Sequence, residues 1–326
     1  GGEEKVRRQH KSNRFTVRER INLFFDKRSF QEVGVLAGKT SYDKNGKLID
    51  FTPSNSIIGQ GLVEGSTIIF YGDDFTVRGG ASDAAIWDKM IAAEKFANEY
   101  ELPLVRFIEG TGGGGSVKTL ETQGFSYVPY NPAWDLVVAN LSKIPVVSLA
   151  LGPVAGLGAA RLVSSHYSIM VKKTSQIFVA GPPLVEKIGE KVSKEKLGGS
   201  LIHGPNGVVD DVAENEKEAM IMTKKFLSYM PNSINELPKR KLSKDKVSRK
   251  DKFLLNVIPR NKRESYDIVP IIKSVVDKNS FFEIGRKYGL SVISGFARLN
   301  GYPVIILANN PQVYGGGWTS SASKKI

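Results

Sequence analysis

An internal repeat constrains the fold of this chain more than any other feature of its sequence. The stretch IIGQGLVEGSTIIFYGDDFTVRGG at 57–80 returns as ISGFARLNGYPVIILANNPQVYGG at 293–316, at one constant offset. Four glycines of the first stretch, Gly59, Gly65, Gly79 and Gly80, meet glycines in the second. A shorter match pairs SFQEVG at 29–34 with SFFEIG at 280–285. The chain is therefore expected to contain two copies of one structural unit.

The two copies differ in how the chain continues after them. The first runs on into further strand and helix patterns, whereas the second stops at Ile326, where the next helix is due. We therefore expect a complete domain at 1–237, a basic linker at 238–265 and the start of a second, truncated domain at 266–326. A split subunit, a shortened chain or an incomplete sequence would each produce this pattern.

Alternating strand and helix patterns fill the first domain. We expect a charged helix at 3–26, strands at 66–74, 102–110 and 144–152, helices at 81–100, 132–143 and 156–166, and short strands at 167–171 and 175–181. Strands that alternate with helices are typical of an α/β domain with a largely parallel sheet.

Composition narrows the possible functions. The chain has no cysteine, which excludes disulfides, thiolate metal sites and cysteine nucleophiles. Its formal net charge is +13, which favours an anionic partner such as nucleic acid, an anionic membrane or a phosphorylated small molecule. A solvated basic surface explains the charge equally well, and the run at 238–252 is typical of a polar linker. That run lacks the aromatic residues that single-stranded nucleic acid requires. No apolar run is long enough to predict a membrane span.

Two glycine-rich turns follow neighbouring strand patterns. GPVAGLGAA at 152–160 leads from a strand into a helix, and EGTGGGG at 109–115 follows another strand. If those strands are parallel neighbours, both turns lie at the carboxyl edge of one sheet, where α/β proteins bind ligands. Two backbone N–H groups that converge there form an oxyanion hole. Tight packing is the alternative explanation for each turn. The GTGGGG turn matches neither a phosphate-binding nor a dinucleotide-binding fingerprint.

Side-chain catalysis has few candidates in this sequence. No Ser–His–Asp pattern has nucleophile-elbow spacing, and the three histidines lie too far apart to predict a metal site. His166 follows a helix and is expected to pack or cap. His203 lies in a predicted loop, and a catalytic role for it stays a candidate. Catalysis by backbone dipoles suits the stabilisation of an enolate made from a thioester.

Several long motifs carry a family resemblance. They are FTVRERINLFFDKRSFQEVG (15–34), DDFTVRGGA (73–81), LGPVAGLGAA (151–160), SQIFVAGPPLV (175–185), EKLGGSLIHGPNGVVDDVAENEKEA (195–219) and GFARLNGYPVIILANNP (295–311). In this order they resemble the carboxyltransferase (β) subunits of biotin-dependent acyl-CoA carboxylases, the propionyl-, methylcrotonoyl- and acetyl-CoA carboxylase group. The resemblance implies crotonase-like (ClpP/crotonase) domains, with a complete N-terminal copy and the start of a second.

The resemblance also implies a site. The N-terminal domain would hold the acyl-CoA, and the C-terminal domain would hold biotin. The implied enolate-binding amides belong to Gly156, Leu157, Gly158, Gly112, Gly113 and Gly114. Contacts with coenzyme A are expected from Arg18, Arg20, Arg78 and Ala155, and no metal is expected. The sequence departs from the family pattern at Gly110, Gly115 and Leu157, which puts side-chain contacts and substrate choice in question.

The implied function is transfer of CO2 from carboxybiotin to the α-carbon of an acyl-CoA through an enolate. A biotin-dependent decarboxylase or transcarboxylase is an alternative, and a non-catalytic scaffold in a carboxylase assembly is another. Biotin would arrive on a carrier, with a biotin carboxylase or carrier subunit as partner, and the chain would form a homo-oligomer (a trimer of dimers). Nucleic acid is not an expected partner. The expected location is the cytoplasm or the mitochondrial matrix, and this fragment alone is expected to be inactive.

Overall fold

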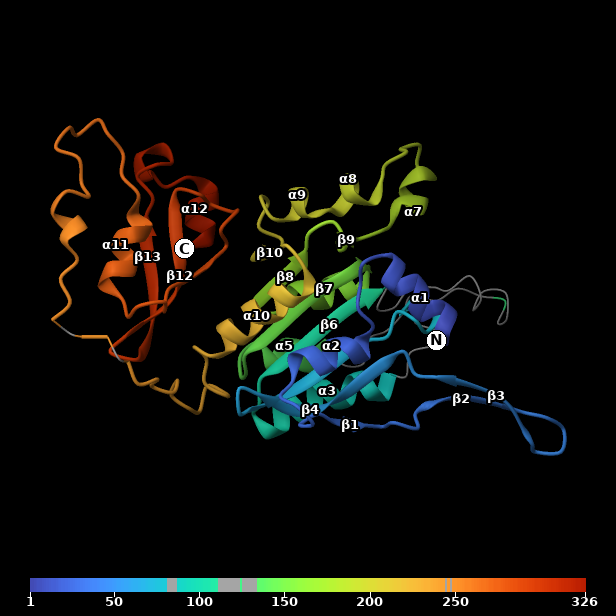
Figure 1. Cartoon of the computed structure of the whole chain (residues 1–326). Coiled ribbons are helices and arrows are strands. Elements are labelled where there is room, and N and C mark those ends of the chain that lie inside the picture. The colour runs from blue at the N-terminus through green and yellow to red at the C-terminus, as the bar shows by residue number, and fades with distance from the viewer. Residues whose placement is uncertain (81–86, 111–123, 125–133, 244, 247) are drawn as a thin grey trace.

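The computed structural model describes residues 1–80, 87–110, 124, 134–243, 245–246 and 248–326. These residues form a larger α/β unit and a smaller unit, joined by an extended segment (Figure 1). The larger sheet has the strand order β1-β4-β5-β6-β7-β8-β10, with β9 paired to β7. The smaller sheet has the order β11-β12-β13, and β2 pairs with β3 in a separate hairpin.

Strands and helices have these bounds. The strands of the larger unit are β1 (Gln31–Val33), β2 (Gly38–Tyr42), β3 (Leu48–Pro53), β4 (Ser56–Val63), β5 (Ser66–Asp73), β6 (Leu104–Gly110), β7 (Val146–Ala155), β8 (Tyr167–Val171), β9 (Gln176–Phe178) and β10 (Asp211–Ala213). Its helices are α1 (Glu3–Lys11), α2 (Val17–Phe24), α3 (Trp87–Tyr100), α5 (Trp134–Asn140), α6 (Leu157–Val163), α7 (Pro182–Glu186), α8 (Lys194–Gly198), α9 (Ser200–His203) and α10 (Glu216–Leu227), with the 3-10 turn η1 (Arg78–Gly80). The rest of the chain contains η3 (Lys252–Leu255), α11 (Ile268–Val275), β11 (Phe282–Ile284), β12 (Val292–Leu299), β13 (Tyr302–Asn309), η4 (Tyr314–Gly316) and α12 (Ser320–Lys325).

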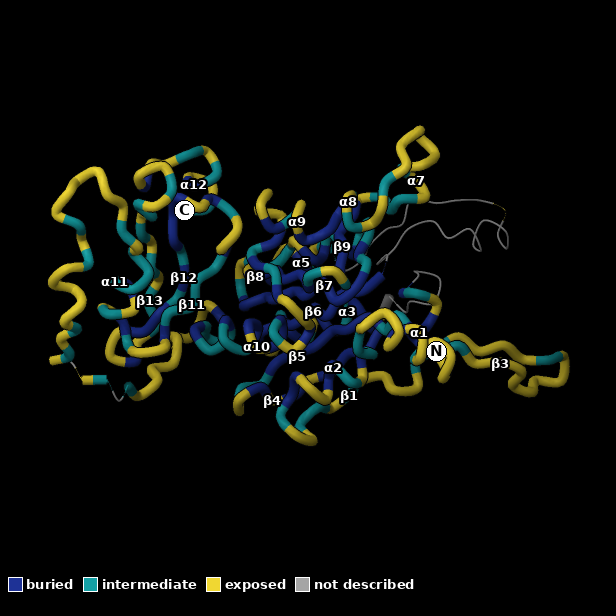
Figure 2. The backbone as a smooth tube through the Cα atoms, turned by 45° about the horizontal axis from the view of Figure 1, so that its top comes forward, coloured by how far each residue is buried: buried dark blue, intermediate teal, exposed yellow. Residues whose placement is uncertain are grey.

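The core of the larger unit lies on both faces of its sheet. Because successive side chains of a strand point to opposite faces, Phe70 and Phe107 reach one face and Ile69 and Leu104 the other. The first face is covered by α2 and α10, and the second by α3 and α6. The central strands are buried along their length, whereas the β2–β3 hairpin is mostly exposed (Figure 2). Strands β5, β6, β7, β8 and β10 run parallel, as a layered α/β unit requires.

The predicted α/β class and most predicted elements are confirmed. The three long strands, the two short ones and the helix after β7 form where the sequence pattern places them, within a few residues. Parts of the helices expected at 81–100 and 132–143 lie outside the described residues. The single helix expected at 3–26 is wrong, because α1 ends at Lys11 and α2 begins at Val17. Asn13 takes a positive φ of 55°, and Thr16 starts a new helix with a capping box to Glu19.

The sequence repeat is also a structural repeat. Helix α11, strands β11 to β13 and turn η4 follow the order of α2, β1, β4, β5 and η1. Gly79 and Gly315 share the left-handed conformation, with φ of 61° and 60°. The turns after β4 and β12 are closed in the same way: Asp26 accepts the amides of Glu64 and Gly65 at 3.1 and 2.9 Å. Asp277 accepts those of Asn300 and Gly301 at 3.0 and 2.7 Å.

The smaller unit packs against the larger through aromatic rings. Tyr229, just after α10, stacks on Phe296 with ring centroids 5.7 Å apart, and Phe282 lies against Tyr167 at 5.9 Å. Part of the segment expected to be a solvated linker takes part in this packing, since the Lys241 amide donates to the Gly301 carbonyl at 3.0 Å. Among the described residues, no helix has both the length and the apolar character needed to cross a bilayer.

The repeated turn generates a stability prediction. Asp26→Ala removes the acceptor for two amides of the β4–β5 turn, and we expect it to lower the free energy of unfolding by about 1 kcal/mol. Asp43→Ala is the matched control, because Asp43 accepts the amides of Asn45 and Lys47 at the tip of the exposed hairpin, both at 2.8 Å. Its effect on global unfolding should stay within about 0.5 kcal/mol. Urea denaturation followed by circular dichroism measures both, and equal losses would contradict the prediction.

Candidate functional site

The turn between β7 and α6 is built around Gly156. This residue has φ 59° and ψ −125°, a conformation that favours glycine, and it serves as the N-cap of α6. Its carbonyl accepts the Ala160 amide at 3.1 Å, and its own amide donates to the Phe178 carbonyl of β9 at 3.1 Å. The Gly156 amide is thus engaged in the fold. The amides of Leu157 and Gly158 occupy the first turn of α6, where the helix itself supplies no acceptor.

The second glycine turn starts beside the first. Strands β6 and β7 are parallel neighbours, and Gly110 at the end of β6 pairs with Val154. The chain that leaves Gly110 therefore begins next to Ala155 and Gly156. Gly112, Gly113 and Gly114, with Gly115, lie outside the described residues. That the two turns start at one sheet edge is confirmed, and the convergence of their amides stays a prediction.

A third glycine turn touches the same edge. Gly80, at the end of η1, lies so close to β6 that a Cβ built on it would sit 2.6 Å from the Glu109 carbonyl oxygen. A Cβ on Gly110, whose φ is 121°, would sit 2.9 Å from the Cα of Gly80. No side chain fits between these backbones. Close packing against the candidate site therefore requires Gly80 of the repeated GG pair, whereas Gly79 is favoured by its φ of 61°.

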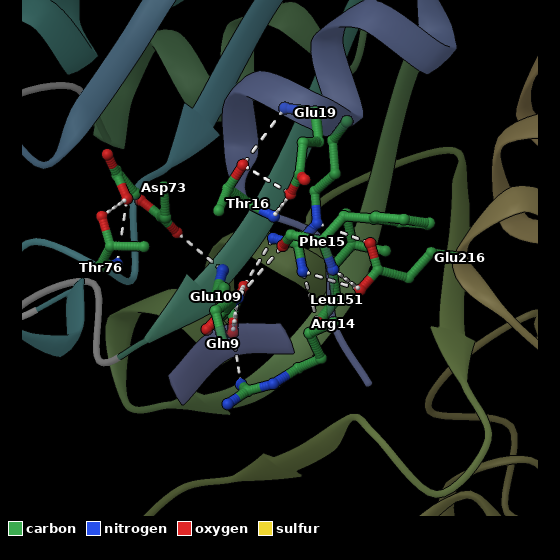
Figure 3. Close-up of polar contacts among 12 residues, drawn as sticks. Gln9, Arg14, Phe15, Thr16, Glu19, Asp73, Thr76, Glu109, Leu151 and Glu216 are labelled. Atoms are coloured by element: carbon green, nitrogen blue, oxygen red, sulfur yellow. Dashed lines mark hydrogen bonds and ion pairs between the residues drawn. The ribbon is translucent and has the colours of Figure 1, made fainter. Parts of the chain in front are cut away.

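A buried carboxylate lies directly behind this edge. The Glu109 side chain has no exposed surface, and it accepts hydrogen bonds from Arg20 at 2.5 Å, from Arg14, and from Gln9 at 3.0 Å (Figure 3). The Glu109 amide donates to the Asp73 carboxylate at 2.9 Å. The residue before the glycine-rich turn is thus fixed through both its side chain and its backbone.

Arg20 connects this carboxylate to two further elements. Its Nε and Nη2 donate to Glu216, at the start of α10, at 2.7 and 3.0 Å. Nη2 also donates to the Leu151 carbonyl of β7 at 3.0 Å. Burial lowers the pKa of Arg20, but Glu109 and Glu216 outweigh this and keep it above the ordinary arginine value. The guanidinium is therefore charged and paired, although Arg20 is only 1% exposed.

The predicted coenzyme A contacts do not gather in one place. The prediction for Arg20 is corrected, because a guanidinium enclosed by two carboxylates and a carbonyl offers nothing to a phosphate in solution. Arg18 points outward on the same helix and pairs with Glu32 of β1 at 2.6 Å. Ala155, half-buried, and Arg78, exposed in η1, lie at the edge beside Gly110 and Gly156. Arg20 is therefore buried behind the edge and Arg18 is paired on the exposed side of α2, whereas Ala155 and Arg78 lie at the edge itself.

A second buried network holds α6 in place. Arg106 of β6 forms a two-pronged pair with Glu94 of α3 at 2.9 and 2.8 Å. It also donates to the carbonyls of Arg161 and Ser164, near the end of α6, at 3.2 and 2.8 Å. The Arg161 guanidinium lies 4.2 Å from the ring centre of Tyr71. Because α6 is tied to β6, α3 and β5, its first turn has a fixed position relative to the sheet.

Sequence reasoning missed both networks. The available signal was a charged residue inside an otherwise apolar strand, as in LVRFIEG, which carries Arg106 and Glu109. The histidines behave differently. His166 is exposed, and it accepts the Val146 amide at 3.1 Å and donates to the Leu141 carbonyl at 2.9 Å, in agreement with the capping role. His203 ends α9 rather than lying in a loop, and its Nε2 lies 2.9 Å from the Ile177 carbonyl.

Asp73 is a second buried carboxylate behind the edge. It is buried, accepts the Tyr71 hydroxyl at 2.7 Å and the Glu109 amide at 2.9 Å. Burial raises its pKa to about 6, although Arg161 and these hydrogen bonds act in the opposite direction. The described residues contain no group of three or more His, Cys, Asp or Glu placed to hold a metal ion. The edge therefore offers backbone donors, with its two carboxylates facing inward.

Comparisons with known proteins agree on one family. The model of the carboxyl transferase domain matches residues 8–326. The mitochondrial propionyl-CoA carboxylase beta chain of Sus scrofa is 31% identical over 328 residues, which cover 97% of this chain and 58% of the relative. The methylmalonyl-CoA decarboxylase subunit alpha of Veillonella parvula is 29% identical over 327 residues, or 100% of this chain and 63% of the relative.

A solved structure has the same fold. The transcarboxylase 12S structure with methylmalonyl-coenzyme A and methylmalonic acid bound superposes with a TM-score of 0.86 at 27% identity, covering 99% of this chain and 62% of that one. The predicted similarity to carboxyltransferase folds is confirmed. The chain spans about three fifths of the length of the curated relatives it matches.

The buried ion pairs generate a stability prediction. Arg20→Met leaves Glu109 and Glu216 buried with too few partners, and we expect a loss of about 3–5 kcal/mol in the free energy of unfolding. Arg18→Met is the matched control, two residues away on the same helix, and its exposed pair should contribute less than about 1 kcal/mol. Arg20→Lys, which keeps the charge, should fall between the two. Denaturant titration measures the free energy of unfolding of all three variants. A loss for Arg20→Met as small as that of the control would contradict a stabilising role for the Arg20 ion pairs.

Asp73 generates a prediction about pH. Its ordinary pKa is 3.8, and in the fold it is about 6, so between these values the folded state holds a proton that the unfolded chain has lost. The stability contributed by that proton is present below pH 3.8 and is lost as the pH rises through about 6. Asp73→Asn stays neutral, and its Oδ1 can still accept the Glu109 amide while its Nδ2 donates to the Tyr71 hydroxyl, which reverses that hydrogen bond. Its stability relative to the parent should therefore rise on the order of 3 kcal/mol from pH 4 to pH 7. A difference that stays constant over this range would refute the assignment.

Proposed function

The chain belongs to the carboxyl transferase domain family, and on this basis we propose that it takes part in carboxyl transfer at the α-carbon of an acyl-CoA thioester. This membership agrees with the resemblance seen in its motifs. The observation that carries the proposal is the meeting of the β6 and β7 ends, which brings the first turn of α6 next to the start of the second glycine-rich turn. In this proposal the site lies at that edge.

The reaction requires a donor for a developing negative charge. Removal of the α-proton moves charge onto the thioester oxygen, and the amides of Leu157 and Gly158 supply hydrogen bonds to it from the positive end of α6. The Gly156 amide orients the turn through Phe178 rather than binding the oxygen. One such donor is worth about 100- to 1,000-fold in rate. Gly112, Gly113 and Gly114 are proposed to supply the opposing donors.

The electrostatics of the edge support this role. Glu109 and Asp73 lie nearest to the two turns, but they are buried and engaged by Arg20, Tyr71 and backbone amides. No carboxylate of the described edge therefore competes with an enolate for the amides. Carboxybiotin on a carrier would supply the carboxyl group from the side of the second domain.

The proposed substrate is a short acyl-CoA. Propionyl-CoA and methylmalonyl-CoA appear in the names of the relatives above, and these thioesters differ by one carboxyl group on the α-carbon. Carboxylation, decarboxylation and transcarboxylation use the same half-reaction, so all three remain within the proposal. Ala155 and Arg78 are the proposed contacts for coenzyme A at this edge, and the exposed Arg18 stays a more distant candidate.

The rest of the assembly is part of the same proposal. Residues 1–237 would form the acyl-CoA side and 266–326 the start of the domain on the biotin side. A biotin carrier and a biotin carboxylase would be partners, within a homo-oligomer such as the hexamer described for transcarboxylase 12S. A non-catalytic scaffold is the second candidate. The half-buried Leu157, which stands where the family pattern has glycine, favours it.

Two measurements test the proposal. Calorimetry with propionyl-CoA should show saturable binding to the chain, and absence of binding would favour the scaffold. In the chain's own assembly with its biotin carrier, Gly156→Ala should lower the rate of label transfer at least tenfold, because alanine is strained at φ 59° and shifts the first turn of α6. Gly46→Ala at the hairpin tip, with φ 78°, is the matched control and should leave the rate unchanged. Unchanged rates in both variants would remove α6 from the mechanism.

A further inference from the structure

A crevice lies where the smaller unit meets α10. It consists of two adjoining cavities of about 390 and 230 Å³, which share Ser228, Lys241 and Arg298 as walls. We name these two cavities together the junction crevice. We propose that the junction crevice binds a compact phosphate-bearing small molecule, at a site separate from the glycine-rich turns.

Cations dominate the lining of the junction crevice. The larger cavity is lined by Lys225, Lys241, Lys278 and Arg298, and the smaller adds Lys224, Lys239 and Arg240. Lys225 is half-buried and donates to the Asn279 carbonyl at 3.2 Å. Burial lowers its pKa, and the charges of Lys241 and Arg298 lower it further. Like charges held together in this way repel one another, and a bound anion would relieve the repulsion.

The carboxylates in the lining have other partners. Asp277 accepts the two amides of the β12–β13 turn. Asp245 pairs with Arg249 at 3.3 Å and accepts the Lys278 amide at 3.0 Å. Glu64 is exposed at the rim of the smaller cavity and is the remaining acidic residue in the described lining. The crevice therefore keeps a net positive charge.

The wall that carries Lys241 is held in place. Arg240 donates to the backbone and side chain of Asn300, both at 3.0 Å, and its guanidinium lies 4.8 Å from the ring centre of Tyr302. Arg298 donates to the Lys239 carbonyl at 3.1 Å and the Gly301 carbonyl at 2.8 Å. The basic run after the larger unit is thus fixed against the smaller one at 239–241, which sets the Lys241 backbone at the mouth of the crevice.

The repeat shows that the strand itself does not require a cation at this position. Arg298 occupies the position that Leu62 occupies in the first copy. The adjacent turn is closed by an equivalent aspartate in each copy, Asp26 in the first and Asp277 in the second. The cation at 298 is therefore an addition specific to the junction. A concave cavity of this size accommodates a small molecule rather than a flat membrane surface, so we assign the phosphate to a soluble ligand.

The junction crevice is remote from the glycine-rich turns. Its smaller cavity is lined by Ser66 and Pro103, at the starts of β5 and β6. The turns lie at the opposite ends of these strands, and the seven residues of β6 span about 20 Å. The crevice and the proposed acyl-CoA site thus lie at opposite edges of one sheet.

Calorimetry with inorganic pyrophosphate at fixed ionic strength tests the proposal. We expect saturable binding to the chain, and at least tenfold weaker binding to the double variant Lys225→Gln with Lys241→Gln. The matched control, Lys44→Gln with Lys262→Gln, changes the net charge equally at two exposed positions outside the lining. It should change affinity less than twofold. Circular dichroism checks that both variants are folded.

Three results would overturn the proposal. Equal weakening in the two double variants would show a general effect of net charge. Displacement of pyrophosphate by propionyl-CoA through the crevice lysines would make the crevice part of the thioester site. Binding to vesicles of anionic phospholipid, lost in the crevice variant, with no binding of pyrophosphate, would assign the surface to a membrane. None of these results depends on whether the chain transfers carboxyl groups.

Discussion

The pairing of Glu109 with Arg20 is the interaction on which most of the larger unit depends. Glu109 ends a central strand, and a carboxylate there without partners would cost several kcal/mol to bury. Arg20 and Arg14 supply the positive charges that pair with Glu109, and Gln9 donates a further hydrogen bond. Helix α1, the following loop and α2 therefore all contact the Glu109 side chain. Glu216 then joins α10 to the same guanidinium. The cluster connects both ends of the larger unit to the middle of its sheet.

This cluster also shapes the chemistry available in front of it. The carboxylates of Glu109 and Asp73 face into the protein, and the surface beyond them consists of backbone turns with little side chain. Those turns have small residues because the backbones approach closely, as at Gly80 and Gly110. Packing and access to amides are therefore two results of the same construction. At Gly80 and Gly110 the packing explanation therefore holds, and the proposed access to amides concerns the first turn of α6 next to them.

The sequence was sufficient for the features that depend on local pattern or on repetition. The repeat predicted a second copy of one structural unit, and the strand–helix alternation predicted a largely parallel sheet. It was insufficient for the buried charges. Arg20 and Glu216 lie 196 residues apart, and no local pattern distinguishes Arg20 from the exposed Arg18 two positions before it. The helix predicted at 3–26 failed for a related reason, because the chain breaks at Asn13 and Thr16 to let Arg14 and Arg20 reach Glu109.

The long separations within the buried cluster have a consequence for biosynthesis. The two carboxylate partners of Arg20 are made 89 and 196 residues after it. At typical elongation rates of about 5–20 residues per second, roughly 10 to 40 seconds pass between the synthesis of Arg20 and that of Glu216. During this interval Arg20 lacks its pair with Glu216 and α2 lacks α10 beside it, so part of the apolar face of α2 stays uncovered. A nascent chain of this protein therefore carries an unfinished amino-terminal segment on the ribosome until most of the larger unit has been made, which makes that segment a natural target for molecular chaperones.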